Sequence, residues 1–447
     1  MTNTFSLSRR QFIRTAGAVV VGFAMPAAFR GFAGPAPATA LPGVAPDPSQ
    51  LDSWLAVAAD GSVTIYTDKV ELGMGVSTAF AQIVADELDV PVRAISVVLG
   101  DTATTPDQGG VGGSTSISVG ANPIRQAAAE ARRVLLGLAS VRLAAPADQL
   151  QIHNGIVTRV DDPAKTVSFG ELIGGRRFDV ALNTAGANYT LAVSGSARPK
   201  SPDQYKVVGT SVPRTDIPPK AAGRFSYIVD VRVPGMLHGR VIRPPSLGAK
   251  LISVDAARGV PGLAKVVRKG NFLGVVAETE WDAVQAAQKL EVRWSAAAPA
   301  WPSMTDLYAT MWAMPVRERR VMVQTGDVEA ALTSAARTIE ARYAWPFQSH
   351  AMMGPSCAVA EVHDGVATLW SSTQHPHQLQ GGIAELLGLP VEKVRVIWVE
   401  GAGSYGRSGT DDAAADAALL AQAVGRPVRV QWMRADETGW DPKGPAV

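Results

Sequence analysis

Residues 387–406 read LGLPVEKVRVIWVEGAGSYG, and this stretch organises the C-terminal part of the chain. A helical pattern ends in Leu387-Gly388-Leu389-Pro390, and the mostly apolar run 394–399 has the length and composition of a buried strand. A Gly-rich loop, Gly401 to Gly409, and a helical pattern over 411–424 come next. The stretch therefore predicts the order helix, turn, strand, Gly-rich loop, helix.

The same order occurs near the N-terminus. A hairpin signal at Asp60-Gly61 precedes a helical pattern with apolar residues at helical spacing, and Leu88-Asp89-Val90-Pro91 then corresponds to Leu387-Gly388-Leu389-Pro390. A strand over 95–99 and a Gly-rich loop over 109–113 follow. The last element is a long helix that we expect to open at Asn122-Pro123 and to pack through Ile124, Ala127, Ala131, Val134, Leu135 and Leu138.

Both copies also begin with a hairpin, because 357–360 and 366–370 flank the turn signal Asp364-Gly365. Chance agreement between common elements is one explanation. The other is a pair of related segments, each with its own Gly-rich loop, which would suit a large cofactor held from both sides.

A different region lies between the two copies. The stretch 194–219 is rich in Ser, Pro and Lys and is typical of a linker, as is the Ala-, Pro- and Trp-rich stretch 296–302. Between these linkers, 225–233 and 237–241 are predicted strands and 281–290 is a predicted helix. We expect an α+β insert over about 205–295.

Composition excludes several classes of protein. Of the 447 residues, 47% are hydrophobic and 18% are charged, and Gly and Pro show no collagen-like period, so disorder, collagen and coiled coil are excluded. The one cysteine, Cys357, excludes a disulfide framework and any iron–sulfur cluster held by this chain alone. A net charge of +2 gives no argument for binding nucleic acid.

The N-terminus resembles an export signal. Ser8-Arg9-Arg10-Gln11-Phe12-Ile13-Arg14 is a twin-arginine pattern, and the uncharged run 16–29 is shorter than the roughly 20 residues that span a bilayer. Ala36-Pro37-Ala38 and Ala38-Thr39-Ala40 are both suitable cleavage sites. We expect export to the periplasm by the twin-arginine (Tat) translocon, after folding around a bulky cofactor; a basic terminus without this role is the alternative.

Two other chemistries have weaker support in the residues. Gly401-Ala402-Gly403-Ser404-Tyr405-Gly406 matches the G-x-G-x-x-G pattern of NAD(P)-binding folds, but Asp436 and Glu437 lie farther away than the roughly 20 residues expected for the ribose-binding acid. His375 and His377 could seed a zinc site, but no further ligands at suitable spacing accompany them. The nucleophile pattern G-x-S-x-G fails at Ala402.

At this point the residues resemble a known family. Lys69-Val70-Glu71-Leu72-Gly73-Met74-Gly75 is similar to the K-V-E-x-G-x-G stretch of the xanthine oxidase and aldehyde oxidase family of molybdenum hydroxylases. The segment 230–245 resembles the family's a/b hammerhead domain, Ser372-Thr373-Gln374 its T-Q element, and Gly401 to Gly406 its G-G-G-F-G-G loop. The order of these pieces is similar to rearranged subunits related to isoquinoline 1-oxidoreductase, and 354–360 and 411–416 resemble nicotinate dehydrogenase-like members.

The resemblance implies a fold and a reaction. The implied fold is α+β, with two molybdenum-cofactor-binding α/β segments on either side of a hammerhead-like domain. The implied domains are a signal peptide at 1–40, a permuted molybdopterin-binding segment at 46–200, the hammerhead-like domain at 205–295 and an incomplete molybdopterin-binding segment at 304–447. The reaction would insert water-derived oxygen into an N-heteroaromatic or aldehyde C–H bond, using molybdopterin with molybdenum in the cytosine dinucleotide form. Electrons would leave through an iron–sulfur subunit, with a c-type cytochrome as a further candidate partner.

The resemblance also assigns roles to residues. Gln374 matches a glutamine that hydrogen-bonds the molybdenum oxo ligand, and Tyr405 and Gly406 match the F-G pair whose backbone approaches the metal. Ser114, Thr115 and Ser116 match residues that bind the phosphate of the pterin, for which hydroxyl and backbone N–H donors are suited. No residue is expected to bind the metal directly. The implied cofactor-binding residues are Gly73, Met74, Gly75, Gly113, Ser114, Thr115, Ser116, Gln374, Gly403, Ser404, Tyr405 and Gly406.

The chain departs from the family pattern in three places. Met74 stands where many members have a glutamine, and Arg407-Ser408 follows the loop where xanthine oxidases carry a substrate-binding glutamate two positions later, so we expect no purine selectivity. The family's catalytic glutamate lies in a G-x-G-E-like motif near the end of longer subunits, and no such motif occurs here, so the catalytic residue is unknown. We expect a C-terminal portion or a separate subunit to supply it and residues 41–447 alone not to turn over. A non-catalytic cofactor-binding remnant and an exported NAD(P)-binding dehydrogenase are the alternatives.

Overall fold

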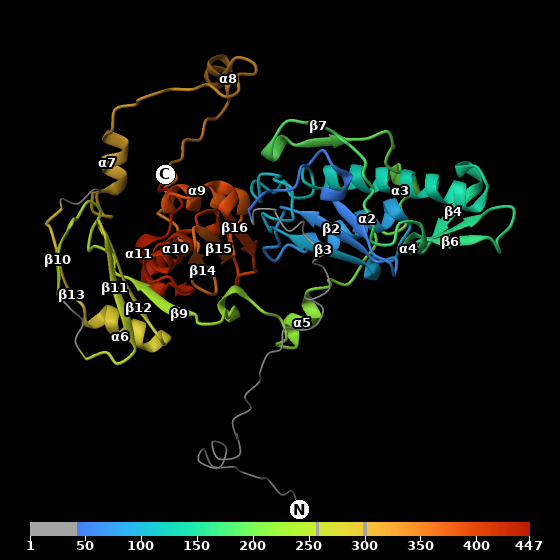
Figure 1. Ribbon diagram of the computed structural model, residues 1–447. Helices are drawn as coiled ribbons and strands as arrows, with labels where there is room; N and C mark the ends of the chain where they lie inside the picture. The colour runs from blue at the N-terminus through green and yellow to red at the C-terminus, as the bar shows by residue number, and fades with distance from the viewer. Residues whose placement is uncertain (1–42, 256–258, 298–301) are drawn as a thin grey trace, which may run out of the picture. The chain divides into compact units, whose positions relative to one another are not determined.

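Both predicted segments have the order of elements that the sequence indicates (Figure 1). In the first, strands β1 (Leu55–Val57) and β2 (Val63–Thr67) form an antiparallel hairpin, and β3 (Ile95–Leu99) pairs in parallel with β2 after helix α2 (Val76–Leu88). Helix α3 (Ala121–Leu143) follows the Gly-rich residues 100–120, which we call the first loop. The computed structural model describes residues 43–255, 259–297 and 302–447, so the predicted signal peptide lies outside the described residues.

The second segment repeats this topology. Strands β14 (Cys357–His363) and β15 (Val366–Ser371) form the hairpin, and β16 (Val394–Trp398) pairs in parallel with β15 after helix α9 (Pro376–Leu387). Helix α10 (Asp412–Val424) follows residues 399–411, which we call the second loop. Thr67 pairs with Leu99 and Ser371 with Trp398 at the ends of the two parallel ladders, so each loop leaves the sheet at the carboxyl end of a strand. The prediction of two related segments is confirmed at the level of topology.

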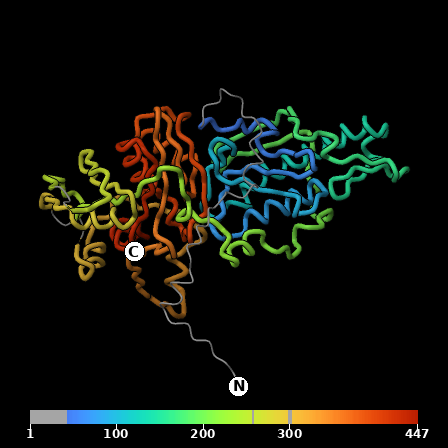
Figure 2. The backbone as a smooth tube through the Cα atoms, turned by 60° about the horizontal axis from the view of Figure 1, so that its bottom comes forward, coloured from blue at the N-terminus to red at the C-terminus, as the bar shows by residue number. Residues whose placement is uncertain are grey.

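The insert and the second segment share one mixed sheet of seven strands. Its order is β11-β12-β9-β17-β14-β15-β16, and Figure 2 shows its C-terminal strands, in orange and red, running side by side. The additional strands are β9 (Leu237–Val241), β11 (Leu263–Lys269), β12 (Phe272–Ala277) and β17 (Val428–Gln431). Since β9 pairs with β17, the predicted boundary between 205–295 and 304–447 does not coincide with a sheet boundary.

The remaining elements form smaller units. A second sheet of three strands contains β4 (Leu150–His153), β5 (Ile156–Arg159) and β6 (Thr166–Ser168), and two-stranded sheets join β7 (Asn183–Ala185) to β8 (Ala192–Ser194) and β10 (Leu251–Asp255) to β13 (Glu291–Trp294). The other helices are α4 (Phe169–Leu172), α5 (Ile217–Ala221), α6 (Glu280–Lys289), α7 (Leu307–Ala313), α8 (Val328–Ser334) and α11 (Arg434–Trp440). None of the described helices is long and apolar enough to span a membrane.

Each segment has its own hydrophobic core. In the first, α2 and α3 pack against each other and α2 covers β3, so that Phe80, Ile124 and Leu135 are buried. In the second, α10 lies against β14 and β17. The buried face of α10 is made largely of alanines, which have no long side chain and let the helix come close to the sheet. These residues are Ala413, Ala414, Ala417, Ala418 and Ala421.

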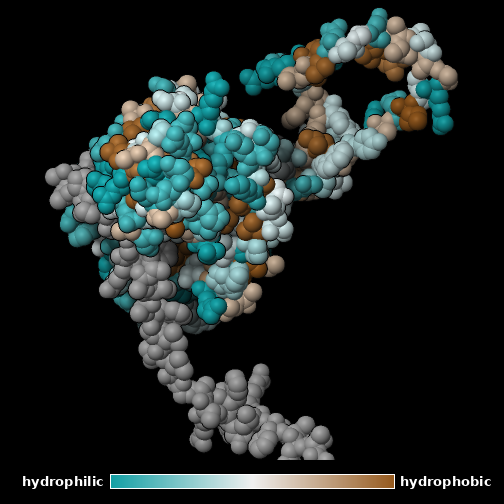
Figure 3. Space-filling model, turned by 90° about the vertical axis from the view of Figure 1, so that its right-hand side faces the viewer, coloured by the Kyte–Doolittle hydropathy of each residue, from teal (hydrophilic) through white to brown (hydrophobic). Residues whose placement is uncertain are grey.

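One segment, residues 312–349, is exposed along its whole length. Figure 1 shows it as an arc, and Figure 3 shows apolar residues among the polar ones along it; we call it the arm. Trp312 is 61% exposed, Val323 82% and Ile339 80%. At its base, the arm pairs with the last residues of the chain, because Trp345 N donates to Val447 O (2.8 Å) and Gln348 N donates to Gly444 O (3.1 Å). Contiguous exposed apolar residues are typical of surfaces that another polypeptide covers.

Three local predictions are wrong. Residues 225–233 form no strand, because the Asp230 carboxylate accepts the Tyr227 N–H (3.0 Å) and caps a short 3₁₀ turn instead. Helix α3 begins at Ala121 with Gly120 as its N-cap, and Asn122 donates to Ser118 O rather than capping the helix. Leu138, expected on the packed face, is 39% exposed, because the buried face of the helix passes through Leu135, Ala139 and Leu143 instead.

Candidate functional site

The two Gly-rich loops meet at Gln374. Its carbonyl accepts the Val111 N–H (2.8 Å), and its side-chain Nε2 donates to the Val111 carbonyl (3.0 Å), so it holds the first loop through two hydrogen bonds. Its Oε1 accepts the Ser404 hydroxyl (3.1 Å) and its N–H donates to the Ser408 carbonyl (2.8 Å), which holds the second loop. Gln374 is 9% exposed and retains one amide hydrogen on Nε2. One predicted site residue thus joins both loops.

Glycines allow this close approach. Gly110 has a left-handed φ of +69°, and a Cβ at this position would lie 2.4 Å from the Gln374 carbonyl oxygen and 2.5 Å from His375 Nδ1. At Gly100, where φ is +59°, a Cβ would lie 2.7 Å from Cβ of Trp398. Any other L-residue would collide with the opposite segment at these two points.

Lys69 and Glu71, the charged residues of the K-V-E motif, each hold a turn of the chain by hydrogen bonds to the backbone of that turn. Lys69 Nζ donates to the carbonyls of Gln108 (2.7 Å) and Gly110, while Glu71 Oε1 accepts the N–H groups of Gly73 and Gly75, both at 2.8 Å. Lys69 and Glu71 are almost completely buried, at 1% and 2% exposure. Burial lowers the pKa of Lys69. In the sequence these two residues stand out only through a resemblance, and their roles as loop anchors follow from the geometry.

A small pocket lies between the two segments. It is lined by Glu71, Leu72, Ser372, Glu400, Gly401, Gly403, Ser404 and Ser408. A neighbouring, slightly larger pocket shares two of these residues, Ser372 and Ser408. Its other lining residues are Ser356, Cys357, Ser371, Thr410, Asp411, Ala413 and Ala414. The two pockets together form a hydroxyl-rich site beside the second loop, which we call the serine site.

The residues fit a ligand that accepts hydrogen bonds. Ser408 is 5% exposed and Ser116 is also 5% exposed, and neither hydroxyl has a hydrogen-bond partner within the described part of the chain. A buried hydroxyl without a partner is costly, since it has lost its hydrogen bonds to water. Phosphate oxygens and the carbonyl and ring-nitrogen groups of a pterin would each supply the missing acceptor. These donors therefore suit the implied cofactor.

The remaining predicted residues lie on turns around this junction. Gly113 (φ +57°) and Ser114 (φ +59°) follow Val111 in a left-handed turn, and the Thr115 hydroxyl donates to Gly112 O (2.7 Å). Met74, between Gly73 and Gly75, is 51% exposed, and its thioether cannot donate the hydrogen bonds of the family glutamine. Their contact with a cofactor stays a prediction.

The aromatic residue of the second loop points outward. Tyr405 has a left-handed φ of +56° and is 62% exposed. A Cβ at Gly406, where φ is +94°, would lie 3.3 Å from Nε2 of His350. The structure therefore brings Gln374, Ser404 and Gly403 into one site and leaves the Tyr405 side chain at its exposed margin.

A buried carboxylate lies at the start of α10. Asp411 accepts hydrogen bonds from the hydroxyls of Thr373 (2.7 Å) and Ser371 (3.2 Å). Burial raises its pKa to about 7, although these hydrogen bonds oppose the shift. A second buried carboxylate, Asp68, accepts the Gly110 N–H (2.9 Å), and burial raises its pKa to about 6. Neither carboxylate was singled out from the sequence as a functional residue, because only the fold shows their burial.

Arg407 does not take part in the site directly. The resemblance aligns Arg407-Ser408 with the region where xanthine oxidases carry a substrate-binding residue, but the Arg407 side chain is completely buried and lines neither pocket of the serine site. Ser408 is the residue that lines both pockets. The loop thus offers a hydroxyl to the site and no cation.

The geometry disfavours NAD(P) binding at Gly401 to Gly406. In a dinucleotide-binding unit the Gly-rich turn opens the helix directly and the next strand lies beside the first. Here the 3₁₀ turn Arg407–Gly409 separates the Gly-rich residues from α10, and β17 is separated from β16 by β14 and β15. The two histidines that could seed a zinc site make other contacts. His375 forms a hydrogen bond with the Tyr189 hydroxyl (3.1 Å), and His377 forms one with the Thr105 carbonyl (3.1 Å).

Comparison with known proteins identifies both segments. Residues 8–220 and 314–446 each match a family model described as a molybdopterin cofactor-binding domain. A nicotinate dehydrogenase component from Pseudomonas putida is 40% identical over 407 residues, which cover 89% of this chain and 33% of that protein. A component of isoquinoline 1-oxidoreductase from Brevundimonas diminuta is 30% identical over 483 residues, covering 98% of this chain and 61% of that protein.

A solved structure of quinoline 2-oxidoreductase from Pseudomonas putida 86 also matches, with a TM-score of 0.45 and 22% identity over 54% of this chain and 36% of that one. The chain therefore spans between a third and three fifths of the length of the two curated relatives described above.

Proposed function

Because the chain belongs to the xanthine oxidase family of molybdopterin-binding proteins, we propose that it is the cofactor-binding part of a molybdenum hydroxylase. The proposed reaction is the oxidation of an N-heteroaromatic or aldehyde C–H bond with oxygen derived from water. The observation that carries this proposal is the junction at Gln374, where one buried amide holds the loops of both segments around the serine site. The names of the relatives, which include nicotinate, isoquinoline and aldehyde oxidoreductases, support the substrate class.

In this proposal the two loops hold the cofactor through backbone and hydroxyl donors. Ser116 and Ser408 supply unpartnered hydroxyls, and Gln374 supplies its free amide hydrogen. When bound, molybdopterin with molybdenum supplies the two-electron redox chemistry that no side chain of the protein can carry out. We propose the cytosine dinucleotide form, whose phosphates suit the Ser114 to Ser116 turn.

The chain needs partners to complete a catalytic cycle. Iron–sulfur clusters are held by cysteine thiolates, and Cys357 is a single, buried thiol. We therefore propose that an iron–sulfur subunit, or a cytochrome, receives the electrons.

We also propose export by the twin-arginine route. Arg9 and Arg10 carry this proposal, since the receptor reads both guanidinium groups and Lys cannot replace their planar geometry. Replacing both by Lys should leave the precursor in the cytoplasm. An unchanged periplasmic yield would contradict export by this route.

The reaction is tested by isotope labelling. The protein, purified with its partners, is given nicotinate, isoquinoline or benzaldehyde with an artificial electron acceptor in H₂¹⁸O. We expect the product to carry ¹⁸O from the solvent. Oxidation that requires added NAD(P), or a product whose oxygen comes from O₂, would contradict a hydroxylase of this family.

A further inference from the structure

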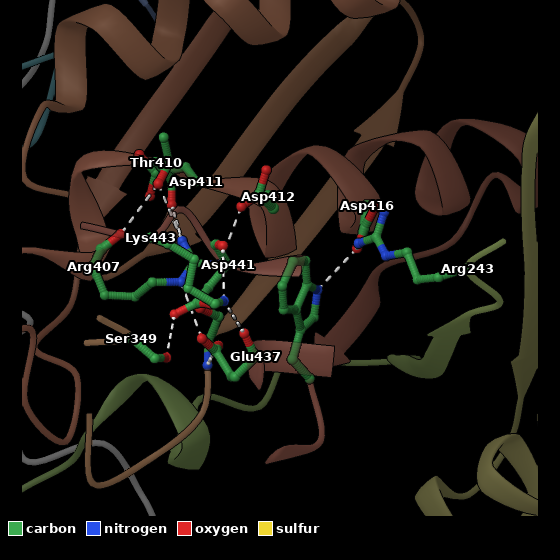
Figure 4. A network of polar contacts seen from close by, with 12 residues as sticks. Arg243, Ser349, Arg407, Thr410, Asp411, Asp412, Asp416, Glu437, Asp441 and Lys443 are labelled. Atoms are coloured by element: carbon green, nitrogen blue, oxygen red, sulfur yellow. Dashed lines mark hydrogen bonds and ion pairs between the residues drawn. The ribbon is translucent and has the colours of Figure 1, made fainter. Parts of the chain in front are cut away.

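Arg407 lies in the chain between Gly406, which ends the Gly-rich stretch, and Ser408, which lines the serine site. Its guanidinium is completely buried. Nε donates to Glu437 (3.0 Å), Nη2 to Asp412 (3.1 Å), and Nη1 to both the carbonyl (2.6 Å) and the hydroxyl (3.2 Å) of Thr410. Figure 4 shows these contacts joining the second loop to α10 and α11.

Glu437 connects Arg407 to Ser356, a residue that lines the serine site. One carboxylate oxygen accepts from Arg407, and the other accepts the backbone N–H of Ser356 (2.6 Å). Ser356 and Cys357, which come before and within β14, and Ser408 and Thr410, which belong to the second loop, all line the larger pocket. The Arg407–Glu437 ion pair therefore links the second loop to Ser356 on the far side of the pair.

Glu437 is held as a carboxylate beside the Arg407 guanidinium. Burial would raise the pKa of Glu437, but the hydrogen bonds from Ser356 and the Arg407 charge bring it below its usual value. The Arg407 guanidinium also stacks over the Trp432 ring at 5.1 Å, and Arg243 lies over the same ring at 4.7 Å. The Trp432 indole is fixed by its hydrogen bond to Asp416 (2.9 Å). The guanidinium is thus restrained both in its plane and perpendicular to it.

Stability alone gives little reason for such a pair. A buried ion pair loses its hydration, and replacing both partners by apolar residues of similar volume is often neutral or stabilising. What the pair provides is a fixed geometry, because a planar guanidinium donates in several set directions that lysine cannot match.

We propose that Arg407 and Glu437 are positioning residues that set the course of the second loop and the width of the serine site, and thereby the affinity for the cofactor. This inference rests on the proposed function, since the cofactor is the ligand whose affinity would change. Neither residue lines the site, so both act through Ser408, Thr410 and Ser356.

The test compares Arg407→Met with Arg320→Met in the full chain. Arg320 forms a 2.8 Å pair with Glu318 on the exposed arm, so the control loses the same group from an exposed pair. Three quantities are measured: pterin retained per chain after purification, by fluorescence of the oxidised pterin; amide hydrogen exchange across 401–410 and at Ser356; and global unfolding in urea. Arg407→Lys, which keeps the charge, and Thr410→Val, which removes one hydroxyl contact, serve as milder variants if Arg407→Met does not fold.

We expect Arg407→Met to retain about 10- to 100-fold less pterin, as for other residues that orient a bound group indirectly. Exchange should accelerate at 401–410 and Ser356 but not within α9, and Arg407→Lys should fall between wild type and Arg407→Met. Pterin retention equal to wild type, or exchange that accelerates equally throughout the chain, would overturn the proposal. If the wild-type protein holds no pterin, the proposed function fails instead, and the exchange measurement still decides whether Arg407 fixes the loop.

Discussion

Replacing Gly110 by alanine should disrupt the junction between the two segments. Two costs add at this position. An L-residue at a left-handed φ of +69° costs about 1–2 kcal/mol. The new Cβ would lie 2.4 Å from the Gln374 carbonyl oxygen and 2.5 Å from His375 Nδ1, so backbone must move, and such overpacking costs about 1–3 kcal/mol more. We expect a loss of about 2–5 kcal/mol in the free energy of unfolding.

Gly365 provides the matched control. Its φ is +73°, but a Cβ there meets nothing within 4 Å, so Gly365→Ala should cost only the backbone term of about 1–2 kcal/mol. Both variants are unfolded in urea and followed by tryptophan fluorescence. Equal losses for the two substitutions would mean that the loops do not meet at Gly110.

Three further predictions concern buried and exposed groups. Burial raises the pKa of Asp411 to about 7 from 3.8, so between about pH 4 and pH 7 the folded state holds a proton that the unfolded state has lost, and the chain loses stability as pH rises through this window. Asp411→Asn should make the free energy of unfolding in urea less dependent on pH there. A pH dependence equal to that of the wild type would show that Asp411 is ionised in the folded chain. Burial raises the pKa of Cys357 to about 11, so an Ellman assay at pH 8 should detect no thiol until the chain is unfolded, and immediate reaction would contradict its burial. Trypsin should cut first at the exposed arginines within the arm, between 317 and 342, and a first cut at the arginines of α3 would show that the arm is covered.

The repeat could be predicted because each element has a local signal. The Asp-Gly turns, the apolar five-residue strands and the Leu-x-x-Pro stretches are all read within a few residues, and the structure gives them the predicted order in both segments. The failed strand at 225–233 has the same kind of local pattern, but the Asp230 side chain competes for the backbone. Side-chain capping of this sort depends on a single residue, and an apolar pattern does not reveal it.

The site could be predicted only in part. Gln374 and Ser404 were named from a resemblance, and the structure joins them by a hydrogen bond. The residues that fix the loops, Lys69, Glu71 and Arg407, act through burial and through contacts that only the folded chain brings together. Burial of a charged residue depends on the assembled fold, and a sequence in which most charged residues are solvated gives no sign of the exceptions.

The cofactor content of the purified protein tests whether the two loops hold a molybdopterin. Metal analysis, fluorescence of the oxidised pterin and nucleotide release by acid are measured on the same sample. We expect molybdenum and pterin in equal amounts, with CMP released from the dinucleotide. Bound NAD(P) in a sample free of molybdenum and pterin would contradict it.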